Sequence, residues 1–461
     1  MQVNTAPTSE TWSSRLTFLL ASIGFAVGLG NIWRFPYIVG ENGGGAFIVV
    51  YLLCAFAIGV PLVISEWTIG RSSSGSASAS GSVRAVAGRN GASVHWGAVG
   101  GIAVLAVFGL MLFYTVVTGW TLDYLVRGIG GSFANIDAAG SRAMFDGLLA
   151  SPWRLAFWHT VVVFLTVYIN SRGIHAGIER AVIILMPALF LSLVAMVAYA
   201  AAVGDFGRTA SFLLAPDFSR LTGDAALVAL GQAFFSIGIA MAVMITYGSY
   251  LGKDISIPRN AFIVVGADTL VALLAGFAIF PLVFAHGFDP GEGTGLVFQT
   301  LPMAFGDLPG GRLFSSVFFF LLIAAALTSC IGNFAPVVAW TAEKLRLGRR
   351  NAALVAGAAM WLLGLGSVFS FNLWADFHPL GFIDKFDGRT IYDTLDYVVS
   401  NVLLPLGALL TSIFIGWFVS PRFAREEAGI ASAFAFGLWR FLIRFVVPVA
   451  VAVILFSGLT S

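Results

Sequence analysis

Charged residues are scarce in this sequence: Asp, Glu, Lys and Arg together make up 10% of its 461 residues. A soluble globular domain carries about 25%, and the hydrophobic content of 58% and the mean hydropathy of +0.91 point the same way. The sequence therefore predicts a polytopic membrane protein without a soluble domain. The formal net charge of +2 gives no argument for a nucleic-acid partner.

Cysteine and histidine are also rare. The two cysteines, Cys54 and Cys330, both lie in apolar segments, so no disulfide framework is implied. The five histidines are scattered without the spacing of a metal site, and no Gly-x-Ser-x-Gly motif supports an intramembrane enzyme. The chain begins with a short polar tail rather than a signal peptide with a recognisable cleavage site. We therefore expect a protein that is not an enzyme.

Uncharged runs reach the roughly 20 residues that a membrane-spanning helix needs. We expect eleven such helices, give or take one, over residues 16–39, 43–68, 92–126, 155–171, 181–203, 225–251, 260–286, 313–342, 351–371, 397–419 and 434–458. The distribution of Lys and Arg between the loops predicts a cytoplasmic N-terminus and an extracytoplasmic C-terminus. Residues 71–91 are expected to be a cytoplasmic connection, flexible at its start, and residues 289–311 a long external loop over a vestibule.

Two of these spans are weakened near their middle. Residues 24–30 contain three glycines, and residues 231–241 of the sixth span contain a second interruption. Gly costs roughly 1 kcal/mol relative to Ala inside a helix, and non-helical backbone at membrane depth persists only where protein or a water-lined cavity covers it. Paired interruptions in two halves indicate the central site of a transporter. The alternative for the first stretch is close packing through Gly24-x-x-x-Gly28.

Four charged residues, Arg34, Glu66, Asp268 and Asp396, lie in or at the ends of apolar spans. A charge at the centre of such a helix costs at least ~2.5 kcal/mol, so these side chains are expected to face partners or water. Arg34 and Asp396 form either a structural ion pair or a gate, and a bound cation is the simplest partner for Asp268. A channel is the main alternative, but no repeated filter motif is present.

Several motifs resemble those of the neurotransmitter:sodium symporter family. The first span matches in Gly24-x-Ala26-Val27-Gly28-Leu29-Gly30-Asn31-x-Trp33-Arg34-Phe35-Pro36, followed by Glu41-Asn42-Gly43-Gly44-Gly45-Ala46-Phe47. Later matches are Phe234-Phe235-Ser236, Thr246-Tyr247-x-Ser249-Tyr250, Leu327-Thr328-Ser329 and Asp396-Tyr397-x-x-Ser400-Asn401 with Leu404-Pro405. The last of these resembles the eleven-helix bacterial amino-acid transporter branch, and the resemblance covers nearly the whole chain.

The resemblance implies an all-α fold of two inverted five-helix repeats, the leucine-transporter-like fold, with discontinuous helices 1 and 6. We expect a cytoplasmic tail over residues 1–15, the first repeat over 16–203, an extracellular connection over 204–223, the second repeat over 224–421 and an additional helix over 422–461. The implied location is the plasma membrane, the bacterial inner membrane. Beyond the lipid bilayer and the substrate no partner is expected; a monomer suffices for transport, and oligomers remain open.

The resemblance also implies two sodium sites and a contiguous amino-acid site. Sodium site one uses Ala26, Asn31, Ser236 and Asp268. Sodium site two uses Gly24, Val27, Ala325, Thr328 and Ser329, although the two hydroxyls of this set can equally bond back to their own helix. The substrate carboxylate is expected to meet sodium one, the N–H groups of Leu29 and Gly30 and the hydroxyl of Tyr114. The substrate amine is expected to meet the carbonyls of Ala26, Phe235 and Ser236.

Two positions predict the substrate class and the ion dependence. Members of the family that carry monoamines have Asp where this chain has Gly28, so this chain is expected to take an α-amino acid, which brings its own carboxylate. Chloride-dependent members are expected to show Asn and Ser where this chain has Asp268 and Ala272. A fixed carboxylate beside the first sodium replaces chloride, and transport is expected to be chloride-independent.

The side-chain subsite and the gates follow from the same resemblance. The subsite comprises Phe25, Leu110, Phe235, Gly238, Met241, Ser329 and Asn333. Gly238 leaves room and Met241 is adaptable, which favours a large hydrophobic or aromatic side chain over a small one, although Phe25 removes some of that room. Asn333 bonds either the substrate or its own helix. The gate residues are Arg34 and Asp396 with Phe235 on the outside, and Tyr250 and Glu343 on the inside.

Two features of the inner side leave alternatives open. The family's Arg before Trp12 is missing from Thr8-Ser9-Glu10-Thr11, which puts the usual inner salt bridge in doubt. Gly177 and Pro187 either let the start of helix 5 unwind or form a packing kink. A transport-incompetent amino-acid sensor would keep the same binding residues, so it remains an alternative function.

Overall fold

The structure, a computed structural model, describes residues 11–73, 75–291 and 295–460, and within them it contains helices and no strand. In this part of the chain, nine helices are long and apolar enough to cross a membrane, or ten if the bent first pair counts as one span. The sixth predicted span, 225–251, consists of two shorter helices, α11 and α12, and is not among these nine or ten. The predicted all-α membrane fold with interrupted first and sixth spans is therefore confirmed.

The first five spans occupy the chain up to Val203. They comprise α1 (Arg15–Ala26), a π-helical turn (Gly30–Arg34) and α2 (Phe35–Glu41); α3 (Gly45–Cys54), a π-helical turn (Ala55–Gly59) and α4 (Val60–Arg71); a short turn (Val94–Trp96) and α6 (Gly97–Gly130); α8 (Pro152–Ser171); and a π-helical turn (Ile174–Glu179) with α9 (Arg180–Val203). The helices between them are α5 (Ala79–Arg89) and α7 (Ala138–Leu149), and α10 (Phe206–Leu214) and a short turn (Phe218–Arg220) follow.

The remaining six spans occupy the chain from Gly223 to Thr460. They comprise α11 (Gly223–Ile237) and α12 (Val243–Ser249); α13 (Ile257–Ala285); α15 (Gly311–Leu345); α16 (Arg349–Phe369); α17 (Ile391–Tyr397), a π-helical turn (Val398–Leu403), α18 (Leu404–Ile413) and a π-helical turn (Phe414–Phe418); and α20 (Ala433–Phe441), a π-helical turn (Leu442–Val446) and α21 (Val447–Thr460). The connections contain a π-helical turn (Leu296–Thr300) with α14 (Leu301–Asp307), a short turn (Asp384–Phe386) and α19 (Pro421–Ala428).

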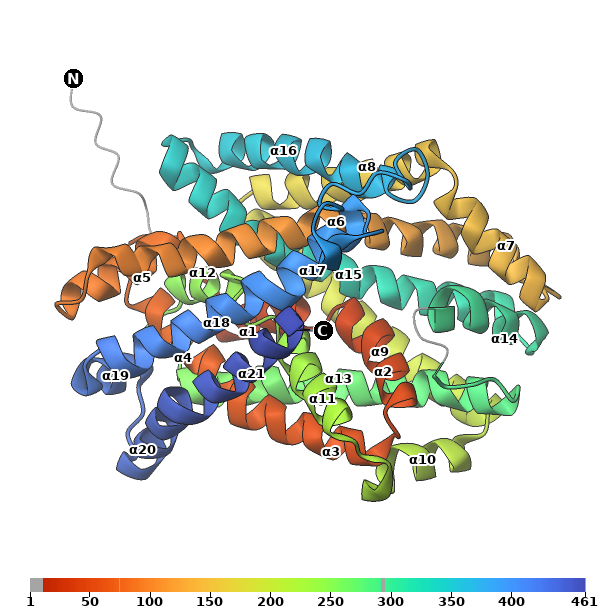
Figure 1. Cartoon of the computed structure of the whole chain (residues 1–461), viewed down its shortest axis with the longest axis horizontal. Coiled ribbons are helices and arrows are strands. Elements are labelled where there is room, and N and C mark those ends of the chain that lie inside the picture. The colour runs from red at the N-terminus through yellow and green to blue at the C-terminus, as the bar shows by residue number, and fades with distance from the viewer. Residues whose placement is uncertain (1–10, 74, 292–294, 461) are drawn as a thin grey trace.

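The two interrupted spans lie in the middle of the bundle (Figure 1). Helices α6 and α15, the longest at 34 and 35 residues, pack along each other, and α15 and α13 both contact α1. Helix α11 packs against α3, and α12 packs against α4. The broken backbone is therefore covered by protein on several sides, which is the condition for its survival at membrane depth.

The two breaks have different local causes. Helix α1 ends at Ala26 because Val27 is extended, with φ −71° and ψ 102°, and the halves of the first span are bent by 50°. Between α11 and α12, Gly238 has a φ of 71°, and two alanines, Ala240 and Ala242, also have positive φ near 60°. That conformation is costly for a residue with a Cβ. Glu66 on α4 stabilises it, because its Oε1 accepts the N–H of Ala240 at 2.8 Å.

Two connections are more ordered than the sequence predicts. Within residues 71–91, α5 begins at Ala79 and is capped by Ser78, whose side chain accepts the N–H of Gly81, and its Val83 and Val86 are fully buried. The predicted loop at 289–311 contains α14 and the turn before it, and the ring of Phe298 in that turn lies 5.6 Å from that of Trp33. Residues 74 and 292–294 of these two connections lie outside the described residues.

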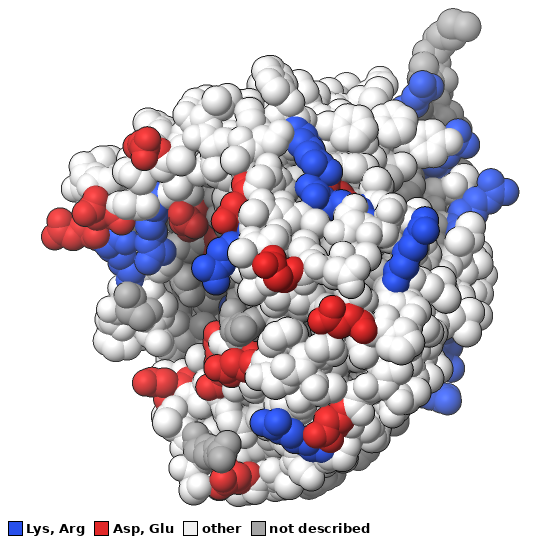
Figure 2. All heavy atoms as spheres, turned by 90° about the vertical axis from the view of Figure 1, so that its right-hand side faces the viewer, with Lys and Arg blue, Asp and Glu red and all other residues white. Residues whose placement is uncertain are grey.

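Charged side chains gather at the ends of the bundle. Figure 2 shows the face at the right-hand end of Figure 1, where α7 and α14 lie, with Lys and Arg interspersed among Asp and Glu. In the last span Arg440 is buried, and its guanidinium donates to the carbonyls of Ile415 and Val419 at 2.7 and 2.8 Å. Such bonds satisfy carbonyls that the end of a helix leaves free, and they join the eleventh span to the tenth.

Candidate functional site

Three polar side chains from three spans meet at the break of the first span. Asn31 donates from Nδ2 to Oδ1 of Asp268 at 2.7 Å and to Oγ of Ser236 at 2.9 Å. Ser236 in turn donates to Oδ2 of Asp268 at 2.7 Å. Asp268 on α13 is completely buried, and these bonds to it come from neutral groups. A buried carboxylate held only by neutral groups is a strong candidate for pairing with a cation.

A second group of oxygens lies where α15 crosses the end of α1. The hydroxyl of Ser329 donates across this interface to the carbonyls of Phe25 at 3.0 Å and Val27 at 3.3 Å. Thr328 instead bonds back to its own helix, donating to the carbonyl of Ala325 at 3.0 Å. One alternative for these two hydroxyls was a bond to their own helix. Thr328 forms such a bond, whereas Ser329 bonds to α1.

Gly24 is held between neighbouring side chains in the second group. A Cβ added there would lie 2.7 Å from Sδ of Met186 and 3.4 Å from Cβ of Thr328. Close packing therefore accounts for this glycine, while the break itself begins three residues later at Val27. Packing and interruption coexist in this stretch.

The donor chemistry of both groups suits a small hard cation such as sodium, because all of the donors are carboxylate, hydroxyl, amide or carbonyl oxygens. The negative end of the α1 dipole lies at the same break. Asn31 has to turn its side-chain amide to present Oδ1 to a cation, since Oδ1 now accepts the N–H of Gly28 at 3.0 Å. The residues present fit the predicted cation sites on these grounds.

A central cavity of about 30 Å³ lies beside these groups. Its lining consists of Phe25, Ala26, Gly28, Gly30, Tyr114, Phe235, Ser236, Gly238, Met241, Ser329 and Asn333. All but Gly28 were predicted to bind substrate. The other two predicted residues lie outside this lining: Leu29 lines a neighbouring cavity, and Leu110 is buried on α6.

The polar end of the central cavity surrounds Gly28. A Cβ added to this glycine would lie 2.7 Å from Oγ of Ser329 and 2.9 Å from the hydroxyl of Tyr114. The N–H of Leu29 donates to that same hydroxyl at 3.1 Å. The backbone and hydroxyl groups predicted to bind a carboxylate are thus adjacent, and no side chain at position 28 occupies the space in front of them.

At the apolar end, the ring of Phe25 lies against Gly238. A Cβ at Gly238 would lie 2.3 Å from Cζ of Phe25, and one at Gly332 would lie 2.8 Å from Cβ of Phe25. The ring of Phe25 therefore takes up the room next to Gly238, as the sequence predicted in part. The glycines accommodate Phe25, and a substrate would pack on the ring rather than replace it.

A larger cavity of about 210 Å³ continues from the central one, with Gly30, Tyr114 and Phe235 lining both. Arg34 and Asp396, the predicted outer gate, both line it. The guanidinium of Arg34 lies 4.6 Å above the ring of Phe235, while Asp396 accepts the hydroxyl of Ser400 at 3.1 Å. The structure thus brings these gate residues to one cavity, with each engaged by a different neighbour.

The predicted inner gate residues, Tyr250 and Glu343, each bond to other neighbours. Tyr250 accepts a hydrogen bond from Arg349 at 3.4 Å, and its carbonyl accepts the N–H of Trp12 at 3.2 Å. Glu343 instead contacts α5 and the segment before it, with Ser76 at 2.9 Å and Arg84 at 4.0 Å. The role of Tyr250 and Glu343 as an inner gate stays a prediction. The missing Arg falls on residues 8–10, which lie outside the described residues, and on Thr11.

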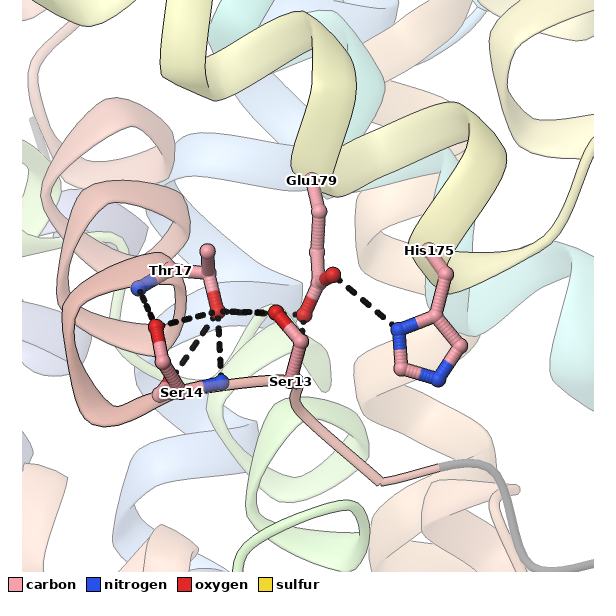
Figure 3. A network of polar contacts seen from close by, with 5 residues as sticks. All are labelled: Ser13, Ser14, Thr17, His175 and Glu179. Atoms are coloured by element: carbon pink, nitrogen blue, oxygen red, sulfur yellow. Dashed lines mark hydrogen bonds and ion pairs between the residues drawn. The ribbon is translucent and has the colours of Figure 1, made fainter.

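The start of the first span is held by a polar network that sequence reasoning missed (Figure 3). Oε1 of Glu179 accepts the N–H of Ser13 at 2.7 Å and the hydroxyl of Thr17 at 3.0 Å. Its Oε2 lies 3.0 Å from Nδ1 of His175 one turn earlier. The signal was weak, because the predicted fifth span began at residue 181 and placed Glu179 in a connection. Gly177 in the same turn lies against the carbonyl of Ile169, so the packing account holds for it.

Known proteins match this chain over almost its full length. A model of the sodium:neurotransmitter symporter family matches residues 9–136 and 145–461. An uncharacterized sodium-dependent transporter of Bacillus subtilis is 37% identical over 447 residues, which cover 96% of both chains. An uncharacterized sodium-dependent transporter of Haemophilus influenzae is 34% identical over 98% of both chains. The solved structure of MhsT in complex with L-phenylalanine is 39% identical, with a TM-score of 0.87 over 97% of this chain and 99% of that chain.

Proposed function

Because the chain belongs to the sodium:neurotransmitter symporter family, it is a sodium-dependent, multi-pass membrane transporter and not an enzyme, and we propose that it imports a neutral α-amino acid. The observation that carries this proposal is the surroundings of Gly28. Ser329 and Tyr114 stand within 3 Å of where a Cβ would be, so the protein supplies no carboxylate there. A substrate with its own carboxylate complements the N–H of Leu29 and the hydroxyl of Tyr114.

Two sodium ions are proposed to bind beside this substrate. The first is coordinated by Asn31, Ser236, Asp268 and the carbonyl of Ala26, and its shell is completed by the substrate carboxylate, which couples the two ligands directly. The second lies between the α1 carbonyls of Gly24 and Val27 and the Ala325–Ser329 turn of α15. The hydrogen bonds that already join α15 to α1 at Ser329 support this second position.

Transport is proposed to be independent of chloride. Asp268 supplies a fixed carboxylate to the first proposed sodium site and accepts a hydrogen bond from Ser236. The hydroxyl of Tyr51 lies 3.4 Å from the hydroxyl of Ser236. A second anion at this position would be repelled by the carboxylate, which already supplies the negative charge that balances sodium. Replacement of chloride by gluconate is therefore expected to leave uptake unchanged.

The proposed mechanism is alternating access with the N-terminus in the cytoplasm. The larger cavity then faces outside, and the Trp12 segment closes the inside; binding of sodium and substrate favours the occluded state, from which the inner side opens. The side-chain subsite contains Phe25, Phe235 and Met241, which favours a large hydrophobic or aromatic amino acid. The phenylalanine bound to MhsT, a structural relative, supports this choice.

Uptake of labelled amino acids into proteoliposomes tests the proposal. Saturable accumulation that collapses when the inward sodium gradient is removed is expected, whereas passive equilibration would indicate a channel. Sodium-dependent binding without any uptake would indicate the alternative, an amino-acid sensor. A competition panel of all the amino acids against the bound label then identifies the substrate.

A further inference from the structure

Asn333 on α15 is a buried side-chain amide whose acceptor is unused. The residue is 3% exposed, and its Oδ1 has no hydrogen-bond partner. It lines the central cavity. An acceptor buried without a partner is unfavourable, because it has lost its bond to water and gained none in return. The cavity that Asn333 lines is the space in which a ligand can supply a partner, once the side-chain amide turns Oδ1 toward it.

The other polar side chains of the central cavity are already bonded to protein. The hydroxyl of Tyr114 accepts the N–H of Leu29, that of Ser236 donates to Asp268, and that of Ser329 donates to α1 carbonyls. Within the described lining, Oδ1 of Asn333 is thus the side-chain oxygen that has no hydrogen-bond partner.

Asn333 also differs from other asparagines on the helices of this chain. Several of them donate from Nδ2 to the carbonyl four residues earlier, at 2.9–3.1 Å: Asn42, Asn90, Asn170, Asn260 and Asn372. No such bond is formed by Asn333 among the hydrogen bonds of the described residues. The alternative in which Asn333 is satisfied by its own helix is therefore not observed.

The position of Asn333 separates it from the polar end of the cavity. It lies four residues after Ser329 on the same face of α15, about 6 Å further along the helix. Ser329 marks the end at which the carboxylate and amine are proposed to bind, beside Gly28. Asn333 consequently lies where the far end of a long side chain would reach, in a cavity that Phe25 also lines.

We propose that Asn333 selects amino acids whose aromatic side chain carries a hydrogen-bond donor, the indole N–H of tryptophan or the phenolic O–H of tyrosine. This inference rests on the proposed amino-acid site and names its substrate class. Phe25 supplies an aromatic surface for the ring, and Oδ1 of Asn333 accepts the donor at its end. An amino acid such as phenylalanine or leucine leaves that acceptor unpaired, and a site built to bond a donor discriminates strongly against analogues that lack it.

Matched pairs of ligands test this inference with the full-length protein in detergent. Tryptophan is compared with 3-benzothienylalanine, in which sulfur replaces the indole N–H, and tyrosine is compared with phenylalanine, in sodium-dependent displacement of a labelled amino acid. We expect the donor-bearing member of at least one pair to bind about tenfold or more tightly. In Asn333→Leu both ratios are expected to fall to about one, while sodium-dependent binding of phenylalanine is retained or strengthened.

Asn351→Leu is the matched control, because Asn351 is exposed on α16 and lines neither the central nor the larger cavity. It is expected to leave both ratios as in the wild type. Ratios near one in the wild-type protein, or ratios that survive Asn333→Leu, would overturn the inference. If Asn333→Leu binds no amino acid, the affinity ratios of the two ligand pairs in the wild-type protein decide whether the inference holds. Absence of sodium-dependent binding of any amino acid to the wild type would instead refute the proposed function.

Discussion

A substitution of Gly28 tests the proposed substrate class most directly. In Gly28→Asp the new Cβ would come within 3 Å of Ser329 and Tyr114, and the new carboxylate would face the proposed position of the substrate carboxylate. Like charges so close cost several kcal/mol, so sodium-dependent amino-acid affinity is expected to fall by at least about 100-fold. Scintillation proximity binding at saturating sodium measures this loss.

The control for that substitution is Gly88→Asp, at an exposed glycine of α5 where an added Cβ meets no atom within 4 Å. It is expected to bind amino acids as the wild type does. Undiminished amino-acid binding by Gly28→Asp would mean that the carboxylate of the substrate binds elsewhere.

Asp268 carries the prediction for the cation. Replacing it by Asn keeps the shape but removes the charge that Asn31 and Ser236 surround. Since cation affinity follows the number of charged ligands, the sodium concentration for half-maximal amino-acid binding is expected to rise about tenfold or more. A sodium titration of Asp268→Asn measures this, with Asp289→Asn, at an exposed position, as the control. An unchanged midpoint would place the first sodium away from Asp268.

For single residues, the sequence was a good guide to which polar groups lie together. It was a poorer guide to how much space remains between them. Asn31, Ser236 and Asp268 were expected together because their motifs are specific, and they do lie within hydrogen-bond distance. That Phe25 removes room beside Gly238 was expected, but how closely its ring lies against this glycine was not, because a motif does not determine which way a neighbouring ring points. The free acceptor of Asn333 likewise depends on its surroundings in three dimensions.

At the scale of secondary-structure elements, the hydrogen bonds between the start of α1 and the turn before α9 lead to a testable prediction about local stability. Glu179 receives two hydrogen bonds from the Ser13–Thr17 segment. A hydrogen bond to a charged group contributes about 1.5–3 kcal/mol, so Glu179→Ala is expected to speed hydrogen exchange of residues 11–17 by about tenfold or more. Hydrogen–deuterium exchange with mass spectrometry on the sodium-bound protein measures this.

His175→Ala provides the comparison for this junction. His175 contacts only Oε2 of Glu179, and its side chain is 53% exposed, so its removal leaves both bonds at Oε1 in place. Exchange of residues 11–17 is expected to change little in this variant. Equal acceleration in both variants would show that the turn as a whole, and not the carboxylate, holds the segment.

The connection at residues 71–91 shows why element predictions failed where they did. Its small residues were interpreted as a connection that is flexible at its start, but from Ala79 they form a helix and permit close packing: a Cβ at Gly100 of α6 would lie 2.4 Å from the carbonyl of Ala79 on α5. Ser80 also donates to the carbonyl of Gly97 at 2.9 Å. Small residues favour both loops and tight helix contacts, so composition alone does not distinguish them.

At the scale of the whole molecule, the two ends of the bundle are closed to different degrees. At one end Trp12 donates from its indole to the carbonyl of Tyr247 at 3.1 Å, which ties α1 to α12. At the other, Arg34 and Asp396 line an open cavity. The proposed cycle therefore requires the closed end to open and the open end to close. We expect the two broken spans to couple these movements, because they contribute residues to both ends.

If the substrate carboxylate completes the shell of the first sodium, sodium and amino acid must strengthen each other's binding equally. Thermodynamic linkage requires the factor by which saturating sodium raises amino-acid affinity to equal the factor by which saturating amino acid raises affinity for that sodium. Equilibrium binding of labelled amino acid across sodium concentrations, and of ²²Na⁺ with and without amino acid, gives both factors. We expect a common factor of about tenfold or more in the wild type, reduced in Asp268→Asn. A factor of one in the wild type would mean that the two ligands bind without contact and that coupling arises only from the change of conformation.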